Sequence, residues 1–317
     1  MIQIGLFGVI AGLTAALLFA APLGGTVFAF PLFLLASLPI AIAGLGWGSL
    51  AGGVALIAAS LAIGVFFSPL AAVLFVCLSG GPIFWLARLT VLSRPTDAAD
   101  PSRGHEWYPL GRILLHAAFV VAGGIVIAGF LTGFDPDALA IDLADSLARW
   151  LAAAPDFGPA PTADQLLPFV RVNLVVMPYV IAALGLLLVI FNLWLGAVIA
   201  KASGRFARPA ERLWTVALPN AGPIGFIVAL GASLLPGPPG EVAGAFAGSL
   251  GCAVAIVGLA VLHAVTQGSG ARSFILGLTY MILFVFGFPI VLFALLGLGE
   301  SFFHLRARRF GGGPRKD

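Results

Sequence analysis

The chain has 317 residues, of which 61% are hydrophobic and 9% are charged, and its formal net charge is +3. Soluble domains carry roughly 25% charged residues, and this chain has no Asp, Glu, Lys, Arg or His before Arg88. Such a stretch cannot cover a water-exposed surface, whereas lipid solvates it, so the composition excludes a soluble domain there. The sequence instead predicts an all-α protein, a polytopic bundle of transmembrane helices.

A membrane-spanning helix needs about 20 mostly apolar residues, and nine segments of the chain meet this requirement. Turns rich in Gly and Pro separate several of them. We therefore expect about eight to nine spans within a single integral membrane domain covering residues 1–317. The predicted spans are 3–21, 27–45, 47–67, 70–88, 111–133, 172–200, 214–235, 242–266 and 273–298.

The distribution of Lys and Arg predicts how the chain is oriented in the membrane. Segments 88–112 and 201–212 each contain four basic residues and should be cytoplasmic, whereas the Asp-rich segment 135–171 should be external. Counting back through four spans places the N-terminus in the cytoplasm.

The basic tail 301–317 should also be cytoplasmic, which requires an even number of crossings. Nine spans do not satisfy this requirement, so one of them must be miscounted. The candidates are the region 27–67 and the span 273–298, which contains the helix-breaking sequence Gly287-Phe288-Pro289.

Segment 136–154 is expected to form a helix of a different kind. Leu139, Leu143, Leu147 and Trp150 recur at helical spacing, and Asp142 lies off that stripe. The pattern predicts an external, interfacial amphipathic helix with its apolar face on the membrane. The alternative is a lid over an outward-facing cavity.

Several motifs of catalysis and metal binding are missing from the sequence. It contains no phosphate-binding Gly-x-x-x-x-Gly-Lys-[Ser/Thr] loop, no His-Glu-x-x-His and no Gly-x-Ser-x-Gly, and its four histidines lack metal-ligand spacing. Charged residues, which cost about 2.5–3.5 kcal/mol at mid-bilayer and are kept there mainly for function, are missing from the middle of the spans. We expect no enzyme activity, no catalytic residues, no metal, no cofactor and no nucleic-acid partner.

Two helix breaks are the first candidates for a binding site. Gly81 and Pro82 interrupt the fourth predicted span, and Asn220 and Pro223 lie in a similar Gly-Pro-Ile break in the seventh. Paired breaks of this kind occur at the binding sites of transporters, because non-helical backbone at membrane depth survives where it lines a cavity. Simple helix kinks are the alternative.

Uncharged polar residues within or beside the spans are the other candidates. Asn173 lies at the start of the sixth span, and His263 and Gln267 share a helix face. With the two breaks they predict a site for a small uncharged or amphiphilic molecule. Such residues also tie helices together by hydrogen bonds, which is the structural alternative.

Small residues also recur at four-residue spacing, a pattern typical of close helix packing. We predict that these ladders pack helices within the chain or against a partner. They are Gly8 and Gly12; Gly44, Gly48 and Gly52; Ala51, Ala55 and Ala59; and Gly244 and Gly248.

Two parts of the chain resemble the YybS-like family of bacterial membrane proteins. They are Leu38-Pro39-Ile40 with the spans over 47–88, and the ending Leu296-Gly297-Leu298-Gly299-Glu300 followed by His304-Leu305-Arg306. The acidic residue of that ending is usually Asp in the family, whereas Glu300 stands here. The family is distantly similar to the S subunits of energy-coupling-factor transporters.

The resemblance implies a multi-pass protein of the bacterial cytoplasmic (inner) membrane that captures a small molecule. Such a protein relies on separate ATPase and coupling subunits, which S subunits contact through small residues of early helices. Ala11 with Ala15, or Ala16 with Ala20, fits that pattern.

Two functions follow as hypotheses. The first is a transporter-like substrate-binding subunit without its own ATPase. The second is a non-transporting membrane scaffold or assembly factor, whose basic residues, including Arg208 and Arg306, bind anionic lipid headgroups. A cavity would favour the first, because a scaffold can be packed solid.

Overall fold

The structure, a computed structural model, describes residues 2–95, 104–153 and 160–309. These ranges are almost entirely helical, with one antiparallel hairpin of strands β1 (Ser93–Pro95) and β2 (His105–Trp107). Seven helical segments in the described part are long and apolar enough to cross a membrane, so the predicted all-α bundle is confirmed. They cover Gln3–Gly24, Ala29–Trp47, Ser49–Phe66, Pro69–Thr90, Leu110–Thr132, Ala163–Ala202 and Pro238–Val265.

Helices α1 (Ile2–Ala20) and α4 (Ser49–Phe66) pack through two of the predicted small-residue ladders. A Cβ atom added to Gly12 would lie 2.4 Å from the carbonyl oxygen of Ala55, and one added to Gly8 would lie 2.8 Å from that of Ala51. No larger side chain fits at either glycine. The ladders therefore bring these two helices together within the chain.

The second span is divided into α2 (Ala29–Leu34) and α3 (Leu38–Trp47), after the short 3-10 turn η1 (Ala21–Gly24). At the division, Asn192 donates from Nδ2 to the carbonyl oxygens of Leu34, at 3.0 Å, and Leu188, at 2.9 Å. This buried asparagine ties helices together, the structural role considered for such residues in the sequence. Gly48, counted in a ladder, instead makes the turn into α4 at φ 90°.

The fourth span runs through α5 (Pro69–Phe75), the π-helical turn η2 (Val76–Gly80) and α6 (Gly81–Thr90). The next helix, α7 (Leu110–Thr132), passes close to this turn, because a Cβ atom at Gly124 would lie 2.1 Å from the carbonyl oxygen of Cys77. The predicted break at Gly81-Pro82 is thus a widened turn inside a continuous helical segment.

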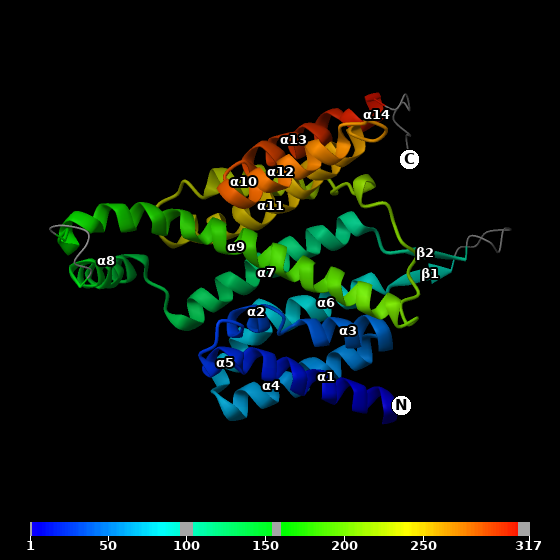
Figure 1. The fold of residues 1–317 in the computed structure, drawn as a ribbon, viewed down its shortest axis with the longest axis horizontal. Helices are drawn as coiled ribbons and strands as arrows, with labels where there is room; N and C mark the ends of the chain where they lie inside the picture. The colour runs from blue at the N-terminus through cyan, green and yellow to red at the C-terminus, as the bar shows by residue number, and fades with distance from the viewer. Residues whose placement is uncertain (1, 96–103, 154–159, 310–317) are drawn as a thin grey trace.

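Helix α8 (Pro136–Ala152) and the first part of α9 (Ala163–Ala202) lie at one end of the bundle, and the rest of α9 runs across it (Figure 1). The 40 residues of α9 extend about 60 Å at 1.5 Å per residue, twice the roughly 30 Å of a hydrocarbon core. The helix therefore extends beyond the predicted span 172–200 at both ends, from Ala163 to Ala202. Helix α8 matches the predicted helix 136–154 up to Ala152, and position 154 lies outside the described residues.

Two predicted spans differ from the structure. Segment 214–235 contains only the 3-10 turn η5 (Leu213–Thr215) and the short helix α10 (Ala221–Ala232), which begins two residues after Pro219. Segment 273–298 is two helices, α12 (Arg272–Phe286) and α13 (Ile290–Phe303), which Gly287 separates with φ 65°. The suspected break in this segment is therefore present.

Helix α11 (Pro238–Val265) is the most buried of the candidate spans. It contacts α7, α9, α10 and α13, and its approach to α13 is so close that a Cβ atom at Gly258 would lie 1.9 Å from the carbonyl oxygen of Phe293. The last helix, α14 (Leu305–Arg309), follows α13. The remainder of the predicted tail, with Arg315 and Lys316, lies outside the described residues.

The two ends of the bundle differ in charge. The β-hairpin, the end of α9 and α14 lie at one end together with the start of α1, and α8 lies at the other (Figure 1). The start of α1 and the end of α14 thus lie at the same end of the bundle, the arrangement that the predicted even number of crossings requires. The first end contains the basic segments, and the α8 end contains the Asp-rich one.

Two arginines of the basic end are structural, contrary to the headgroup-binding role considered for them. The Arg208 side chain is 4% exposed and pairs with Glu211. It also donates to the carbonyl oxygens of Thr90, at 3.1 Å, and Tyr108, at 2.9 Å. Arg306 is similarly buried and pairs with Glu300. Both side chains hold loops against helix ends by hydrogen bonds and ion pairs, and their burial keeps them from contact with lipid.

Candidate binding groove

The structure does not bring the predicted site residues together around one cavity. Asn220 is exposed at the start of α10, and Pro223 is fully buried in that helix. Pro82 is buried in α6, and Gly81 begins that helix against the carbonyl oxygen of Val76. None of these four lines the main cavities of the described residues.

His263 and Gln267 do not form a joint lining either. The His263 Nε2 atom lies 2.9 Å from the Tyr280 hydroxyl of α12, and the His263 carbonyl oxygen accepts a bond from Arg272 at 3.0 Å. These contacts tie α11 to α12. Gln267 is exposed in the turn after α11, because the helix ends at Val265.

Asn173 is the one predicted site residue that lines a main cavity among the described residues. Its Nδ2 atom donates to the carbonyl oxygen of Phe169 at 2.9 Å, so its side chain lies along the surface of α9. The cavity has a volume of about 700 Å³ and is bounded by α8 and α9. We call it the apolar groove, because Asn173 and Ser146 are its only lining side chains with polar atoms among those described.

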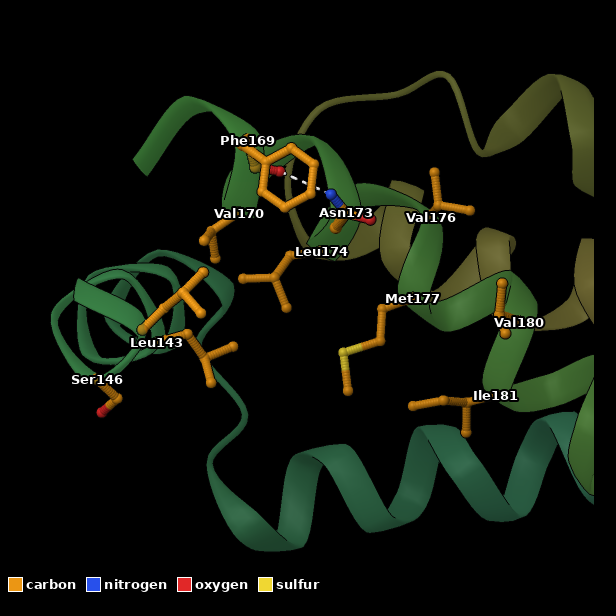
Figure 2. Close-up of a pocket in the computed structure, with 11 residues that line it drawn as sticks. Leu143, Ser146, Phe169, Val170, Asn173, Leu174, Val176, Met177, Val180 and Ile181 are labelled. Carbon is orange, nitrogen blue, oxygen red and sulfur yellow. Dashed lines mark hydrogen bonds between the residues drawn. The ribbon is translucent and has the colours of Figure 1, made fainter. Parts of the chain in front are cut away.

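Figure 2 shows how the two helices flank the apolar groove, which is open on its other sides. Leu143 of α8 and Leu174 and Met177 of α9 point into the same space. Ala140 and Ala144 are buried where α8 meets α9, so small residues make the closest contact and the larger leucines line the space. Helix α8 therefore forms one wall of a cavity, as the lid alternative requires.

A second cavity, of about 360 Å³, lies deeper, between α7, α9 and α11. We call it the inter-helix pocket. It shares Met177 and Ile181 with the apolar groove, and Leu78 of the π-helical turn reaches it from η2. The broken fourth span thus contributes one side chain to a cavity, although Gly81 and Pro82 themselves do not.

A third cavity, of about 810 Å³, lies where the loops of the α8 end meet, and we call it the charged mouth. It shares Leu174 with the apolar groove and Glu241 with the inter-helix pocket. Its charged lining residues are Asp135, Asp137, Arg171 and Glu241. The three cavities together offer apolar surface beside charged surface, the arrangement that an amphiphile needs.

Two features of α9 shape these cavities. Pro178 lines both the inter-helix pocket and the charged mouth, and it has no N–H to donate to the carbonyl oxygen of Leu174. The neighbouring Tyr179 lies against α11, where a Cβ atom at Gly248 would lie 2.2 Å from the Tyr179 carbonyl oxygen. Pro178 and Gly248 therefore mark the point at which α9 crosses α11 in close contact.

Sequence reasoning missed most of the residues around these cavities. Glu241 lies in the first turn of α11, just before the predicted span 242–266, and was not considered. Arg171 lies within α9, just before the predicted span 172–200, and was counted only as a charge of the external segment. Pro178 was a usable signal, since a proline inside a predicted span marks a break. The leucines of α8 were recognised as an apolar stripe, but only the packing of α8 on α9 shows that they face a cavity.

No family model, curated protein or solved structure matches this chain. The resemblance to the YybS-like family therefore stays a prediction. The structure does bear on the small residues considered for partner contact, because Ala15 and Ala16 are buried within the chain. Neither the pair Ala11 and Ala15 nor the pair Ala16 and Ala20 forms an exposed ladder. Among the described residues no His, Cys, Asp and Glu cluster could hold a metal ion.

Proposed function

We propose that this protein is a transporter-like substrate-binding subunit of the bacterial inner membrane that captures a small amphiphilic molecule. The apolar groove and its junction with the charged mouth carry the proposal. Binding sites for small molecules are mostly apolar clefts of about 300–1,000 Å³ with a few placed polar groups. A scaffold needs no such cavity.

The position of the groove suits capture from outside the cell. The groove lies at the acidic end of the bundle, and the basic segments lie at the opposite end. Because basic loops remain in the cytoplasm, the groove would face the external side. The sequence contains no nucleotide-binding loop of the Gly-x-x-x-x-Gly-Lys type, so energy would come from a separate ATPase with its coupling subunit.

Filling the apolar groove should prevent capture. Met177 lines both the groove and the inter-helix pocket, so Met177→Trp should occupy space that the ligand needs. We expect saturable labelling of α8 and α9 by a long-chain alcohol carrying a photoreactive diazirine to fall about tenfold or more. Mass spectrometry of the labelled peptides measures this loss.

The control for this variant is Leu184→Trp. Leu184 is exposed on the same helix and lines none of the three cavities, so this variant should be labelled like the unmodified protein. Equal labelling of the two variants would contradict the proposed site.

Partner subunits require a separate test, native mass spectrometry of the protein extracted gently from its own host's membranes. An assembly with ATPase and coupling subunits, or a defined small-molecule adduct, supports the transporter-like function. A single chain carrying only bulk lipid favours the scaffold instead.

A further inference from the structure

The charged mouth has an excess of negative charge. Its described lining contains three carboxylates, those of Asp135, Asp137 and Glu241, and one cation, Arg171. The Nη2 atom of Arg171 lies 3.5 Å from Oδ1 of Asp137, so these two charges offset each other. The carboxylates of Asp135 and Glu241 remain, which leaves two negative charges facing the cavity.

The helix N-termini at the charged mouth offer no free N–H donors in their first turns, so Arg171 is the only charged donor among its described lining residues. Helix N-termini commonly bind anions through free backbone N–H groups, and both α8 and α11 begin at this cavity. In α8, Pro136 has no N–H, the N–H groups of Asp137 and Ala138 donate to the Asp135 side chain, and that of Leu139 donates to the Asp135 carbonyl oxygen.

The first turn of α11 is equally without free donors. Pro238 and Pro239 have no N–H groups, and the N–H groups of Gly240 and Glu241 both donate to the carbonyl oxygen of Gly237, at 2.9 and 3.3 Å. Pro178 leaves the carbonyl oxygen of Leu174 without its helical donor at the junction with the apolar groove. Apart from the Arg171 guanidinium, the described lining therefore offers more acceptors than free donors.

We infer that the molecule bound in the groove carries a positively charged head group of the alkylammonium or amine class. This inference rests on the proposed function. The head group lies in the charged mouth near Glu241 and Asp135, and the alkyl chain lies in the apolar groove. One molecule can occupy both spaces, since Leu174 lines each of them. An ammonium group matches the negative charge, and a protonated amine supplies the N–H donors that the free acceptors need.

The test compares three probes with the same diazirine-bearing alkyl chain and different head groups: primary ammonium, hydroxyl and carboxylate. The full chain is reconstituted in nanodiscs of zwitterionic lipid, and labelling of α8 and α9 peptides is titrated at low and high salt. We expect the ammonium probe to bind most tightly and the carboxylate probe most weakly, with the difference decreasing as salt screens the charges.

Glu241→Gln is the decisive variant, because it removes one charge and keeps the shape of the side chain. We expect it to weaken binding of the ammonium probe about threefold to fivefold, as for a partly exposed ion pair, and to leave the hydroxyl probe unchanged. Asp164→Asn is the control, since Asp164 is exposed in the first turn of α9 and lines none of the three cavities. Thermal denaturation of both variants verifies that they are folded.

The outcomes separate this inference from the proposed function. Equal labelling by the three probes, or preference for the carboxylate, overturns the inference of a cationic head group and leaves the groove as a binding site. The absence of saturable α8 and α9 labelling with every probe overturns both.

Discussion

Replacing Arg306 with alanine should destabilise the protein by about 3–5 kcal/mol, the typical cost of breaking a buried ion pair. The Nε atom of Arg306 lies 2.8 Å from Glu300, and the two side chains are 13% and 9% exposed. The guanidinium also donates to the carbonyl oxygens of Trp214, at 2.6 Å, and Val216, at 3.1 Å. Its loss leaves a buried carboxylate without its charge partner and two carbonyl groups without this donor. Thermal or chemical unfolding in detergent measures the change.

The matched control for this prediction is Arg94→Ala. Arg94 also pairs with a glutamate, Glu106, at 2.6 Å, but the two side chains are 78% and 54% exposed. Exposed pairs contribute about 0–1 kcal/mol, because water solvates both charges after the pair is broken. If Arg94→Ala and Arg306→Ala lost the same stability, burial would not make the Glu300–Arg306 pair more stabilising than an exposed ion pair.

A double variant separates the loss of the ion pair from the cost of leaving the buried Glu300 carboxylate unpaired. Glu300→Leu with Arg306→Met removes both charges, and replacing a buried pair by apolar residues is often nearly neutral. We therefore expect the double variant to be more stable than Arg306→Ala. The loss of stability that remains in the double variant measures the contribution of the hydrogen bonds from Arg306 to the carbonyl oxygens of Trp214 and Val216.

This ion pair also gives a structural role to two residues of the segment 296–306. Glu300 and Arg306 belong to the ending on which the predicted resemblance to the YybS-like family was based. In the structure they are each other's partners, and the His304 residue between them ends α13 at φ 49°. The tight reversal after α13 brings the arginine back to the glutamate and to the loop before α10.

The second large effect is expected for Gly248→Ala, which should destabilise the protein by about 1–3 kcal/mol through overpacking. A Cβ atom at this position would lie 2.2 Å from the carbonyl oxygen and 2.5 Å from the Cα atom of Tyr179. Both are backbone atoms, so α9 and α11 must move apart. Because Pro178 and Glu241 lie beside this crossing and line the charged mouth, amphiphile labelling should weaken as well.

Gly123→Ala is the control for this prediction. Gly123 is also within a helix, α7, but a Cβ atom there would have no heavy atom within 4 Å apart from its chain neighbours and the adjacent backbone of α7 itself. Alanine is the better helix former by up to about 1 kcal/mol, so this variant should be as stable as the unmodified protein or more stable. A comparable loss in both variants would show that the α9–α11 crossing is not the reason for the effect.

The sequence alone determined the membrane helix bundle, since a run of apolar residues without charges has few other physical solutions. It also indicated the small-residue contacts of α1 with α4, because four-residue spacing places Gly8 and Gly12 on one helix face. The sequence also showed which loops are basic and which are acidic, because the positions of Lys, Arg and Asp between the apolar segments can be read directly from it.

Only the tertiary structure shows where the cavities lie. Asn173, Asn220, His263 and Gly81 were chosen as unusual residues in spans, but spacing along one helix does not show which helices face each other across a cavity. The cavities are lined by side chains from different helices, such as Leu143 of α8, Met177 of α9 and Glu241 of α11. None of these residues stands out within its own segment of the sequence. The same holds for Arg306 and Trp214, 92 residues apart, whose hydrogen bond exists because the chain reverses after α13. Cavities and buried ion pairs depend on contacts distant in sequence, and helical periodicity reports only contacts within one element.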